Sequence, residues 1–254
     1  MSGRTEPVVD VRGLWREFPA EGGRRSLLRV LRGAVKGNGG AAPPRRALQD
    51  VSLTAHRGDR IAVVGNNAAG KSTLLRIVAG LLRPTRGTVA VRGEMVLLTA
   101  LGLGMVEEVS VLENTYLYGA LYGVDPARMR LAIGDILGWA GIAGFEHAKL
   151  KTLSAGTRAR LAFSVVRHID ADVFLIDEAM SAGDVTFAAK CRAFFEEPSS
   201  RDRTFLIATH DMDLARSFCA SALWLHEGRP MEFGDSRTVV DRYLQAQLPR
   251  GPGG

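Results

Sequence analysis

The chain has 254 residues, of which 46% are hydrophobic and 24% are charged, and its formal net charge is +6. These proportions exclude a disordered chain, a collagen and a disulfide scaffold, and the length favours one large α/β domain with a lobe or insertion. Apolar runs stay shorter than about 18 residues and the N-terminus lacks an apolar core, so neither a membrane-spanning segment nor a secretory signal is expected.

Alternating and β-branched residues predict strands at residues 8–11 and 48–54. Between them lies a basic insert, residues 19–46, with seven basic residues and a single acid, Glu21. Apolar residues at positions 27, 28 and 31 predict about two turns of helix within it. The positive charge is compatible with nucleic acid, a membrane surface or an anionic substrate, and does not choose among them.

The rest of the chain is expected to alternate short strands with helices. The expected strands are residues 60–64, 88–91, 95–98, 173–176 and 204–209, and the expected helices are 71–82, 110–122, 126–139, 155–168 and 239–248. The apolar runs at 173–176 and 204–209 are typical of central parallel strands, whereas 88–91 and 95–98 are typical of edge strands. Residues 249–254 are expected to fray, and Cys191 and Cys219 to be free thiols in a reducing compartment.

A phosphate-binding loop is predicted between the strand at 60–64 and the helix that follows, because the pattern Gly-x4-Gly-Lys-Ser/Thr is present. Its residues are Gly65, Asn66, Asn67, Ala68, Ala69, Gly70, Lys71, Ser72 and Thr73. Small residues let backbone N–H groups surround a β-phosphate, and a helix N-terminus adds a favourable dipole. Lys71 would reach the β- and γ-phosphates, and the Ser72 hydroxyl would meet Mg²⁺. A chance Gly-rich turn is the alternative, and the Lys-Ser pair and the flanking elements argue against it.

Two carboxylates, Asp177 and Glu178, end the apolar strand expected at 173–176. In a parallel sheet this end of a strand faces the ligand crevice. Asp177 would hold the Mg²⁺ shell through water, and Glu178 would polarise the attacking water as general base. Alone, such a pair equally suits a cap for the next turn. After a phosphate-binding loop, it fits the second half of a nucleoside-triphosphatase site.

The segment Leu153-Ser154-Ala155-Gly156-Thr157 resembles LSGGQ, the signature of the ATP-binding-cassette (ABC) ATPases. Ser154 and Gly156 match, whereas Ala155 and Thr157 depart from the commonest form. The resemblance implies that the motif opens a helix and contacts the γ-phosphate held by the opposite protomer, which suits the dipole of a helix N-terminus. From its residue type alone Ser154 is an N-cap, and the two roles are compatible.

Further residues resemble other parts of the ABC site. His210 is similar to the family's switch histidine, which bonds the γ-phosphate, and Ser181 and Asp184 fit the loop that crosses the dimer interface. Phe18 is the first candidate for stacking on adenine and Trp15 the second. The alternative is that either aromatic is part of the core.

The resemblance implies a single ABC-type P-loop NTPase domain, residues 1–254, of the α/β class. It would have a RecA-like parallel-sheet core, an antiparallel β subdomain and an α-helical subdomain. The core with its β subdomain is expected at 1–98 and 158–235, the helical subdomain at 99–157, and a C-terminal helix and tail at 236–254.

A narrower resemblance is to the ATPase subunits of bacterial polysaccharide exporters, which carry O-antigen, capsule, teichoic acid or galactan. Four stretches are similar to motifs of that family: residues 181–191 to AVGD…F..KC, 102–105 with 113–114 to GAGF…EN, 152–163 to YSSGM..RLAF, and 15–28 to its N-terminal segment. The resemblance implies an Mg²⁺-dependent ATPase that forms a homodimer and drives a separate transmembrane permease. Its cargo would be a lipid-linked glycan, and its place the cytoplasmic face of the plasma membrane.

Several features depart from those families. The glutamine that ABC proteins carry between core and helical lobe falls near Thr99 and Ala100, and no glutamine stands there, so slow basal hydrolysis is expected. Glu107 and Glu108 follow, and either fill that role or belong to the contact with the membrane subunit. Many O-antigen members also carry a C-terminal carbohydrate-binding domain, and none is expected here. The basic insert is either a solvated loop or a helix that meets anionic lipid.

Other function classes fit less well. An ABC exporter for another lipid or small molecule is the nearest alternative. A DNA-repair ATPase would need a long coiled coil between Gly65 and Ser154, and a ribosomal one would need a second cassette, so no nucleic-acid partner is expected. A catalytically silent module is a further alternative, and intact Lys71, Asp177, Glu178 and His210 argue against it.

Overall fold

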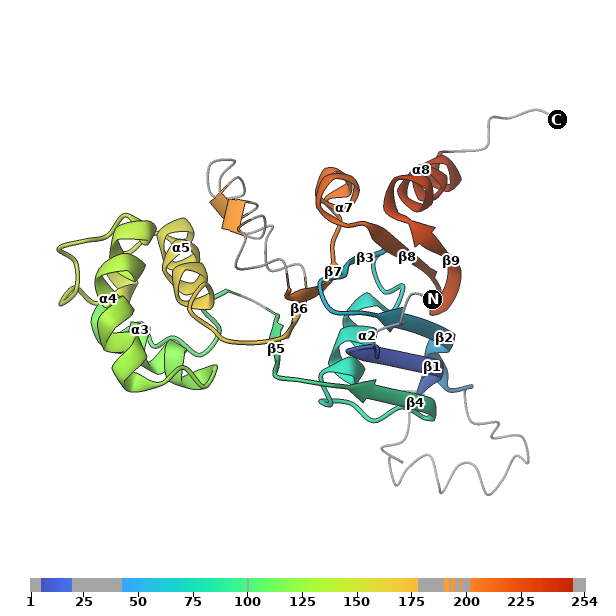
Figure 1. Ribbon diagram of the computed structural model, residues 1–254, viewed down its shortest axis with the longest axis horizontal. Helices are drawn as coiled ribbons and strands as arrows, with labels where there is room; N and C mark the ends of the chain where they lie inside the picture. The colour runs from blue at the N-terminus through green and yellow to red at the C-terminus, as the bar shows by residue number, and fades with distance from the viewer. Residues whose placement is uncertain are drawn as a thin grey trace, which may run out of the picture.

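The computed structural model describes residues 6–19, 43–99, 101–177, 190–191, 193–194, 197 and 202–248. The helix expected within the basic insert and the tail expected to fray at 249–254 lie outside these residues. Two β-sheets and their helices form one body, and three further helices form a lobe beside it (Figure 1).

Both expected sheets are present. A three-stranded antiparallel sheet has the order β2-β1-β4, and a six-stranded sheet has the order β5-β6-β7-β3-β8-β9. Their bounds are β1 Val9–Phe18, β2 Arg45–Ala55, β3 Arg60–Val64, β4 Arg86–Val91, β5 Met95–Leu98, β6 Val173–Asp177, β7 Thr204–Ala208, β8 Ser221–His226 and β9 Arg229–Asp235. In the six-stranded sheet only the β8–β9 pair is antiparallel. The α/β class with a parallel core and an antiparallel β subdomain is confirmed.

The central strands are buried on both faces, which is why they are continuous apolar runs in the sequence. In β6, Val173 and Leu175 pack into the core shared with the three-stranded sheet, while Phe174 and Ile176 pack into the core on the opposite face. Strands β3 and β7 alternate in the same way. As expected, β4 and β5 are edge strands of their sheets.

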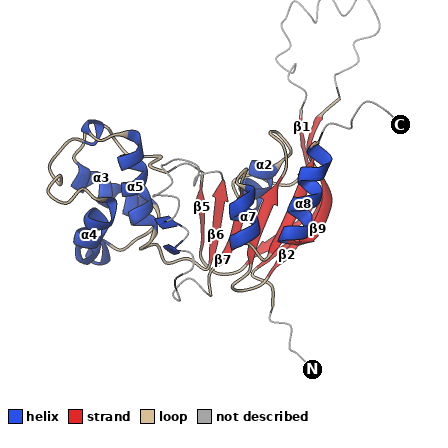
Figure 2. Ribbon diagram, turned by 90° about the horizontal axis from the view of Figure 1, so that it is seen from above, coloured by secondary structure: helices blue, strands red, loops and turns tan. Residues whose placement is uncertain are grey.

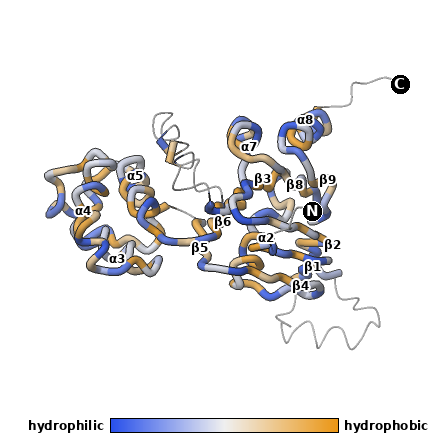
Figure 3. Tube along the Cα trace, viewed as in Figure 1, coloured by the Kyte–Doolittle hydropathy of each residue, from blue (hydrophilic) through white to orange (hydrophobic). Residues whose placement is uncertain are grey.

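The helices cover the sheets in a fixed order, α2 on one side of the six-stranded sheet and α7 and α8 on the other (Figure 2). The bounds are α2 Lys71–Val78, α3 Val111–Leu121, α4 Pro126–Ala140, the 3₁₀ turn η1 Leu150–Thr152, α5 Ala155–Val166, α7 Met212–Phe218 and α8 Ser236–Gln247. Helix α2 contacts strands of both sheets and so forms the layer between them. Helices α7 and α8 each carry hydrophilic and hydrophobic segments, as a half-buried helix requires (Figure 3).

Several boundaries differ from expectation. Strand β1 continues through shifts of register to Phe18, because a bend at Gly13, at φ 53°, turns the strand without ending it. Strand β2 begins at Arg45, so the last two basic residues of the expected insert belong to a strand. Helix α2 ends at Val78, where Gly80 adopts a left-handed φ of 72°. Helix α7 and strands β8 and β9 have no counterpart among the expected elements.

The lobe is formed by α3, α4 and α5, which contact one another. Residue 157, the expected end of the helical subdomain, lies within the first turn of α5, so this boundary cuts a helix that packs against α3 and α4. Helix α3 starts at a capping box in which Ser110 and Glu113 each satisfy a backbone N–H. Among the described residues, no helix combines the length and apolarity needed to cross a bilayer.

Asn114 fixes the loop that leads from β5 into this lobe. Its side chain is fully buried, accepts a hydrogen bond from the Val106 N–H at 2.6 Å, and donates to the carbonyls of Val106, Val109 and Ser110 at 2.9–3.1 Å. One amide therefore satisfies four backbone groups of the loop.

Replacing Asn114 should destabilise the protein, because Asn114→Ala removes all four hydrogen bonds of a buried amide and leaves the Val106 N–H without an acceptor, although the three carbonyls each keep a backbone donor. We expect a loss of about 2–3 kcal/mol in the free energy of unfolding, measured by urea denaturation. The control is Leu117→Ala on the same helix, where the side chain is 50% exposed, with an expected change within about 0.5 kcal/mol. Equal effects of the two variants would contradict the role given to the amide.

Both cysteines are free and buried, and burial raises the pKa of each thiol to about 12. Since the thiolate is the reactive species, the native protein should react slowly with a thiol reagent at pH 8, and both thiols should react promptly in guanidinium chloride. A Leu131→Cys variant, at a position that is 88% exposed, should show one fast thiol under native conditions. Two fast thiols in the unmodified chain would refute the burial.

Candidate functional site

The predicted phosphate-binding loop leaves β3 and enters α2 through unusual backbone conformations. Gly65, Ala68 and Gly70 have φ of 148°, 63° and 111°. A Cβ on Gly65 would lie 2.2 Å from the Leu225 carbonyl oxygen, and one on Gly70 would lie 2.6 Å from that of Ala47. Glycine is therefore required at both ends of the loop by close backbone neighbours as well as by φ.

Neighbouring segments brace the loop from outside. The Gly228 N–H donates to the Ala69 carbonyl at 2.9 Å, and the Gly228 carbonyl accepts from the Gln49 N–H at 2.8 Å. The Tyr243 hydroxyl, from α8, donates to the Asn66 side-chain oxygen at 3.0 Å. These contacts join the loop to β2, to the β8–β9 turn and to the last helix.

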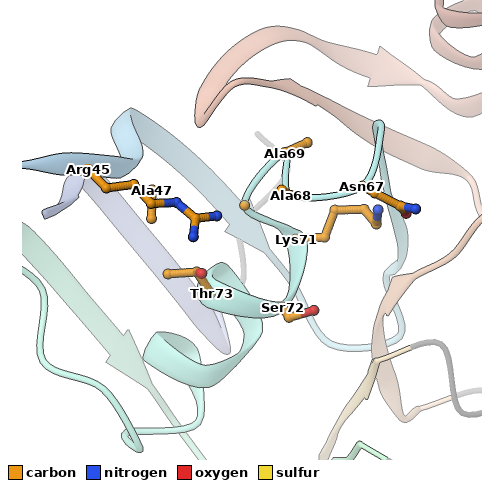
Figure 4. Close-up of a pocket in the computed structure, with 9 residues that line it drawn as sticks. Arg45, Ala47, Asn67, Ala68, Ala69, Lys71, Ser72 and Thr73 are labelled. Carbon is orange, nitrogen blue, oxygen red and sulfur yellow. The ribbon is translucent and has the colours of Figure 1, made fainter. Parts of the chain in front are cut away.

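The first turn of α2 supplies hydrogen-bond donors. The first backbone hydrogen bond of the helix runs from the Leu74 N–H to the Gly70 carbonyl. The N–H groups of Lys71, Ser72 and Thr73 therefore have no acceptor in the helix. No side chain caps this end, and its first turn holds no acid. A pocket opens here, lined by Arg45, Ala47, Asn67, Ala68, Ala69, Gly70, Lys71, Ser72 and Thr73 (Figure 4). Free N–H groups and a positive dipole end make it an anion site.

Lys71 is the buried cation of this site, only 5% exposed. Its ammonium donates to the carbonyls of Gly65 at 2.9 Å and Asn66 at 3.2 Å. It also lies 3.4 Å from Nε2 of His210, which stands directly beyond β7. An ammonium can only donate, so this contact suits an imidazole that accepts at Nε2.

Asp177 and Ser72 meet across the same crevice. Asp177 is the last residue of β6 and is 8% exposed, and its carboxylate accepts a hydrogen bond of 2.9 Å from the Ser72 hydroxyl. Strands β6, β7 and β3 are parallel neighbours, so Asp177, His210 and the loop all follow carboxyl ends of adjacent strands. The structure thus brings Lys71 and Ser72 together with Asp177 and His210, from three segments that are far apart in the sequence.

The signature-like segment opens α5, as its N-cap residue predicted. The Ser154 hydroxyl accepts from the Thr157 N–H at 3.2 Å and lies 2.9 Å from the Thr157 hydroxyl, which also accepts from Arg160 at 2.9 Å. Ser154 and Ala155 are exposed. Two views place α5 away from α2, with β5 and β6 between them (Figures 1 and 2). The segment therefore does not reach the phosphate pocket of its own chain.

Four other predicted site residues have no place in the described pocket lining. Of these, Glu178, Ser181 and Asp184 lie outside the residues that the structure describes. Phe18 is the last residue of β1, and the guanidinium of Arg16 lies 4.5 Å from the centre of its ring. The expected stacking of adenine on Phe18 stays a prediction, because Phe18 is beside the pocket and does not line it.

The loop before α3 is tied to the signature helix by charge. Glu107 accepts from Arg158 at 2.6 Å, and Glu108 pairs with Lys149 at 3.2 Å and with Lys151 at 2.9 Å. Both acids that follow the position of the missing glutamine are thus ion-paired, and their expected roles, in place of that glutamine or in contact with a membrane subunit, stay predictions. The lysine ammonium groups lower the pKa of the Glu108 carboxyl.

Sequence reasoning missed two parts of the site. Arg45 lines the pocket, but it was placed in the basic insert because a strand starting at Leu48 left it outside. Tyr243 was placed in the last helix without a role, and no local pattern could have paired it with Asn66.

Known proteins share this sequence and this fold. A family model described as ABC transporter matches residues 48–181. The teichoic acids export ATP-binding protein TagH of Bacillus anthracis is 36% identical over 197 residues, which is 78% of this chain and 36% of that protein. The O-antigen export system ATP-binding protein RfbB of Klebsiella pneumoniae is 33% identical over 200 residues, covering 79% and 81%. The chain thus spans about a third of the length of the TagH relative.

A solved structure supports the fold. CbiO1 of Clostridium perfringens, part of the ABC transporter complex cbiONQ, superposes with a TM-score of 0.67 at 22% identity and covers 97% of each chain. The family model covers more than half of this chain, and the match to RfbB covers most of both chains. Membership of this family explains why a phosphate loop, a strand-end aspartate and a signature-like helix occur together. The chain is a nucleotide-binding protein of the ABC transporter family.

Proposed function

We propose that the protein hydrolyses ATP with Mg²⁺ and thereby powers the export of a lipid-linked polysaccharide. The hydrolysis of ATP is proposed from one observation. Four side chains converge at the carboxyl ends of three parallel strands: Lys71, His210, Ser72 and Asp177. A buried lysine, free helix N–H groups and a strand-end carboxylate match the needs of a nucleoside triphosphate.

The residues divide the chemistry as follows. The loop N–H groups and Lys71 bind the β- and γ-phosphates, and Lys71 exchanges its bonds to the Gly65 and Asn66 carbonyls for bonds to phosphate. Ser72 and Asp177 present oxygen atoms, the ligands that Mg²⁺ prefers, and Mg²⁺ when bound offsets phosphate charge. His210 bonds the γ-phosphate, and Glu178 takes the proton of the attacking water.

The active form is a homodimer with two nucleotides between its protomers. Support comes from the position of Ser154, exposed at the N-terminus of α5 and separated from its own pocket by β5 and β6. The N-terminus of α5 can meet a γ-phosphate only on a partner chain. Ser181 and Asp184 would lie at the same dimer interface.

Polysaccharide export is proposed from the relatives, whose names place them in teichoic acid and O-antigen export. The partner is a transmembrane permease, and the protein lies at the cytoplasmic face of the membrane through that partner.

Within the chain, we propose that the lobe of α3, α4 and α5 is the helical subdomain. Residues 1–98 and the strands from β6 onward form the core with its β subdomain, and residues 236–254 are a C-terminal appendage.

The nucleotide chemistry can be tested with two substitutions. Lys71→Ala should weaken ATP binding by more than about 30-fold, because phosphate loses its buried cation. Glu178→Gln should bind ATP normally, lose turnover by about 100-fold or more, and accumulate as a dimer with ATP. Binding is measured by calorimetry, hydrolysis by phosphate release, and the dimer by light scattering.

Matched controls keep these results specific. Lys149→Ala, in the lobe, should retain ATP binding, and Glu232→Gln, ion-paired with Arg242 on β9 and α8, should retain turnover. Parental hydrolysis by Glu178→Gln would show that the general base is a different residue.

Export is tested in the source cell. Deletion of the gene should remove a surface polysaccharide and cause its lipid-linked form to accumulate inside, since synthesis continues without transport. The unmodified gene should restore the surface glycan and the Glu178→Gln gene should not, as measured by labelled surface glycan and by extraction of lipid-linked glycan. An unchanged surface and no internal accumulation would refute a role in polysaccharide export.

A further inference from the structure

Arg45 is a second cation at the phosphate pocket. It is the first residue of β2, it is exposed, and it lines the pocket together with the loop and the first turn of α2. Its guanidinium points toward the space beside Thr73, on the opposite side of the loop from Lys71 (Figure 4). None of the lining residues is acidic, so no carboxylate within the pocket neutralises it.

The neighbouring arginines are engaged elsewhere. Arg46, the next residue, pairs with Glu17 at 3.4 Å. Arg16 donates to the Arg83 carbonyl at 2.9 Å and covers the ring of Phe18. Within the part of the chain that the structure describes, the side chain of Arg45 makes no hydrogen bond or ion pair. A side chain this rich in donors, aimed into an anion site, points to a ligand that is itself anionic.

Arg45 lies on the side of the pocket that the start of β2 forms. Arg45 and Ala47 both line the pocket, whereas Arg46, between them, does not. Arg45 is also the cross-strand partner of Phe18. A phosphate chain held by Lys71 near Asp177 and His210 would run past Thr73 toward Arg45, so its nucleoside end would lie on this side.

We propose that Arg45 binds the phosphate nearest the nucleoside and sets the affinity for nucleotide without acting in hydrolysis. This inference rests on the proposed binding of ATP. A guanidinium presents paired N–H groups that match two phosphate oxygens, and the N–H of Thr73, which also lines the pocket, has no acceptor in the helix. ATP and ADP both carry this phosphate, so both depend on Arg45, whereas the γ-phosphate depends on Lys71 and His210.

Binding of ATP, ADP and GTP to the purified full chain tests the proposal. Arg45→Ala should weaken all three by about tenfold and equally, with turnover at saturating ATP unchanged. Arg45→Lys should recover part of the affinity, since it keeps the charge and loses the paired donors. Raised salt should weaken ATP binding less in Arg45→Ala than in the unmodified chain. Arg46→Ala is the matched control and should bind as the unmodified chain does, because Arg46 does not line the pocket and pairs with Glu17.

The outcomes separate this inference from the proposed function. If Lys71→Ala loses ATP while Arg45→Ala binds ATP and ADP normally, the role of Arg45 is overturned and the ATP site stands. A loss confined to ATP and ADP but not GTP would make Arg45 a contact to the base, and would also overturn it. A loss of turnover at saturating ATP would contradict a role in affinity alone. If the unmodified chain binds none of the nucleotides, both proposals fall.

Discussion

The buried ammonium of Lys71 is the interaction on which the site depends. A charge that is 5% exposed needs polar partners, and two carbonyls of its own loop supply them. Those carbonyls point inward only because Gly65, Ala68 and Gly70 hold left-handed or otherwise rare backbone conformations. Ala68 carries a Cβ in such a conformation, a local strain that the bracing from Gly228 holds in place. The loop, its glycines and its braces form one unit around a single charge.

The parallel sheet determines which side chains lie near the Lys71 ammonium. Three neighbouring strands end at the same edge, and the residue at or just after each end carries the chemistry: the loop after β3, Asp177 on β6 and His210 after β7. The lobe is held separately, by its own contacts and by the amide of Asn114. Arg158 of α5 pairs with Glu107 in the loop that follows β5, so a shift of that loop would move α5 as well.

Much of this could be predicted from the sequence, because its strongest signals are local. The loop pattern, the apolar run into Asp177 and the Ser154 cap are each determined within a few residues, and each was found where the sequence placed it. Strand β9 was missed because Pro230 and Gly234 interrupt its short alternation of Met231 and Phe233. Strand β8 does carry a strand signal, the apolar run from Ala222 to Leu225, so its absence from the expected elements has no physical reason. Arg45 and Tyr243 were missed for a different reason, since their partners are distant in sequence and only the folded chain brings them together.

The bond from Tyr243 to Asn66 gives the protein a built-in optical reporter. The ring of Tyr243 lies edge-on to that of Trp224, with centroids 5.8 Å apart, while its hydroxyl bonds the phosphate loop at 3.0 Å. A loop that tightens around phosphate changes the hydrogen bonding of a tyrosine in direct contact with an indole. Trp224 lies on β8, and its ring nitrogen is buried with no hydrogen-bond partner among the described residues, so its emission responds to the packing around the indole. The part of the fluorescence that comes from Trp224, one of three tryptophans in the chain, can therefore follow the state of the loop without an attached dye.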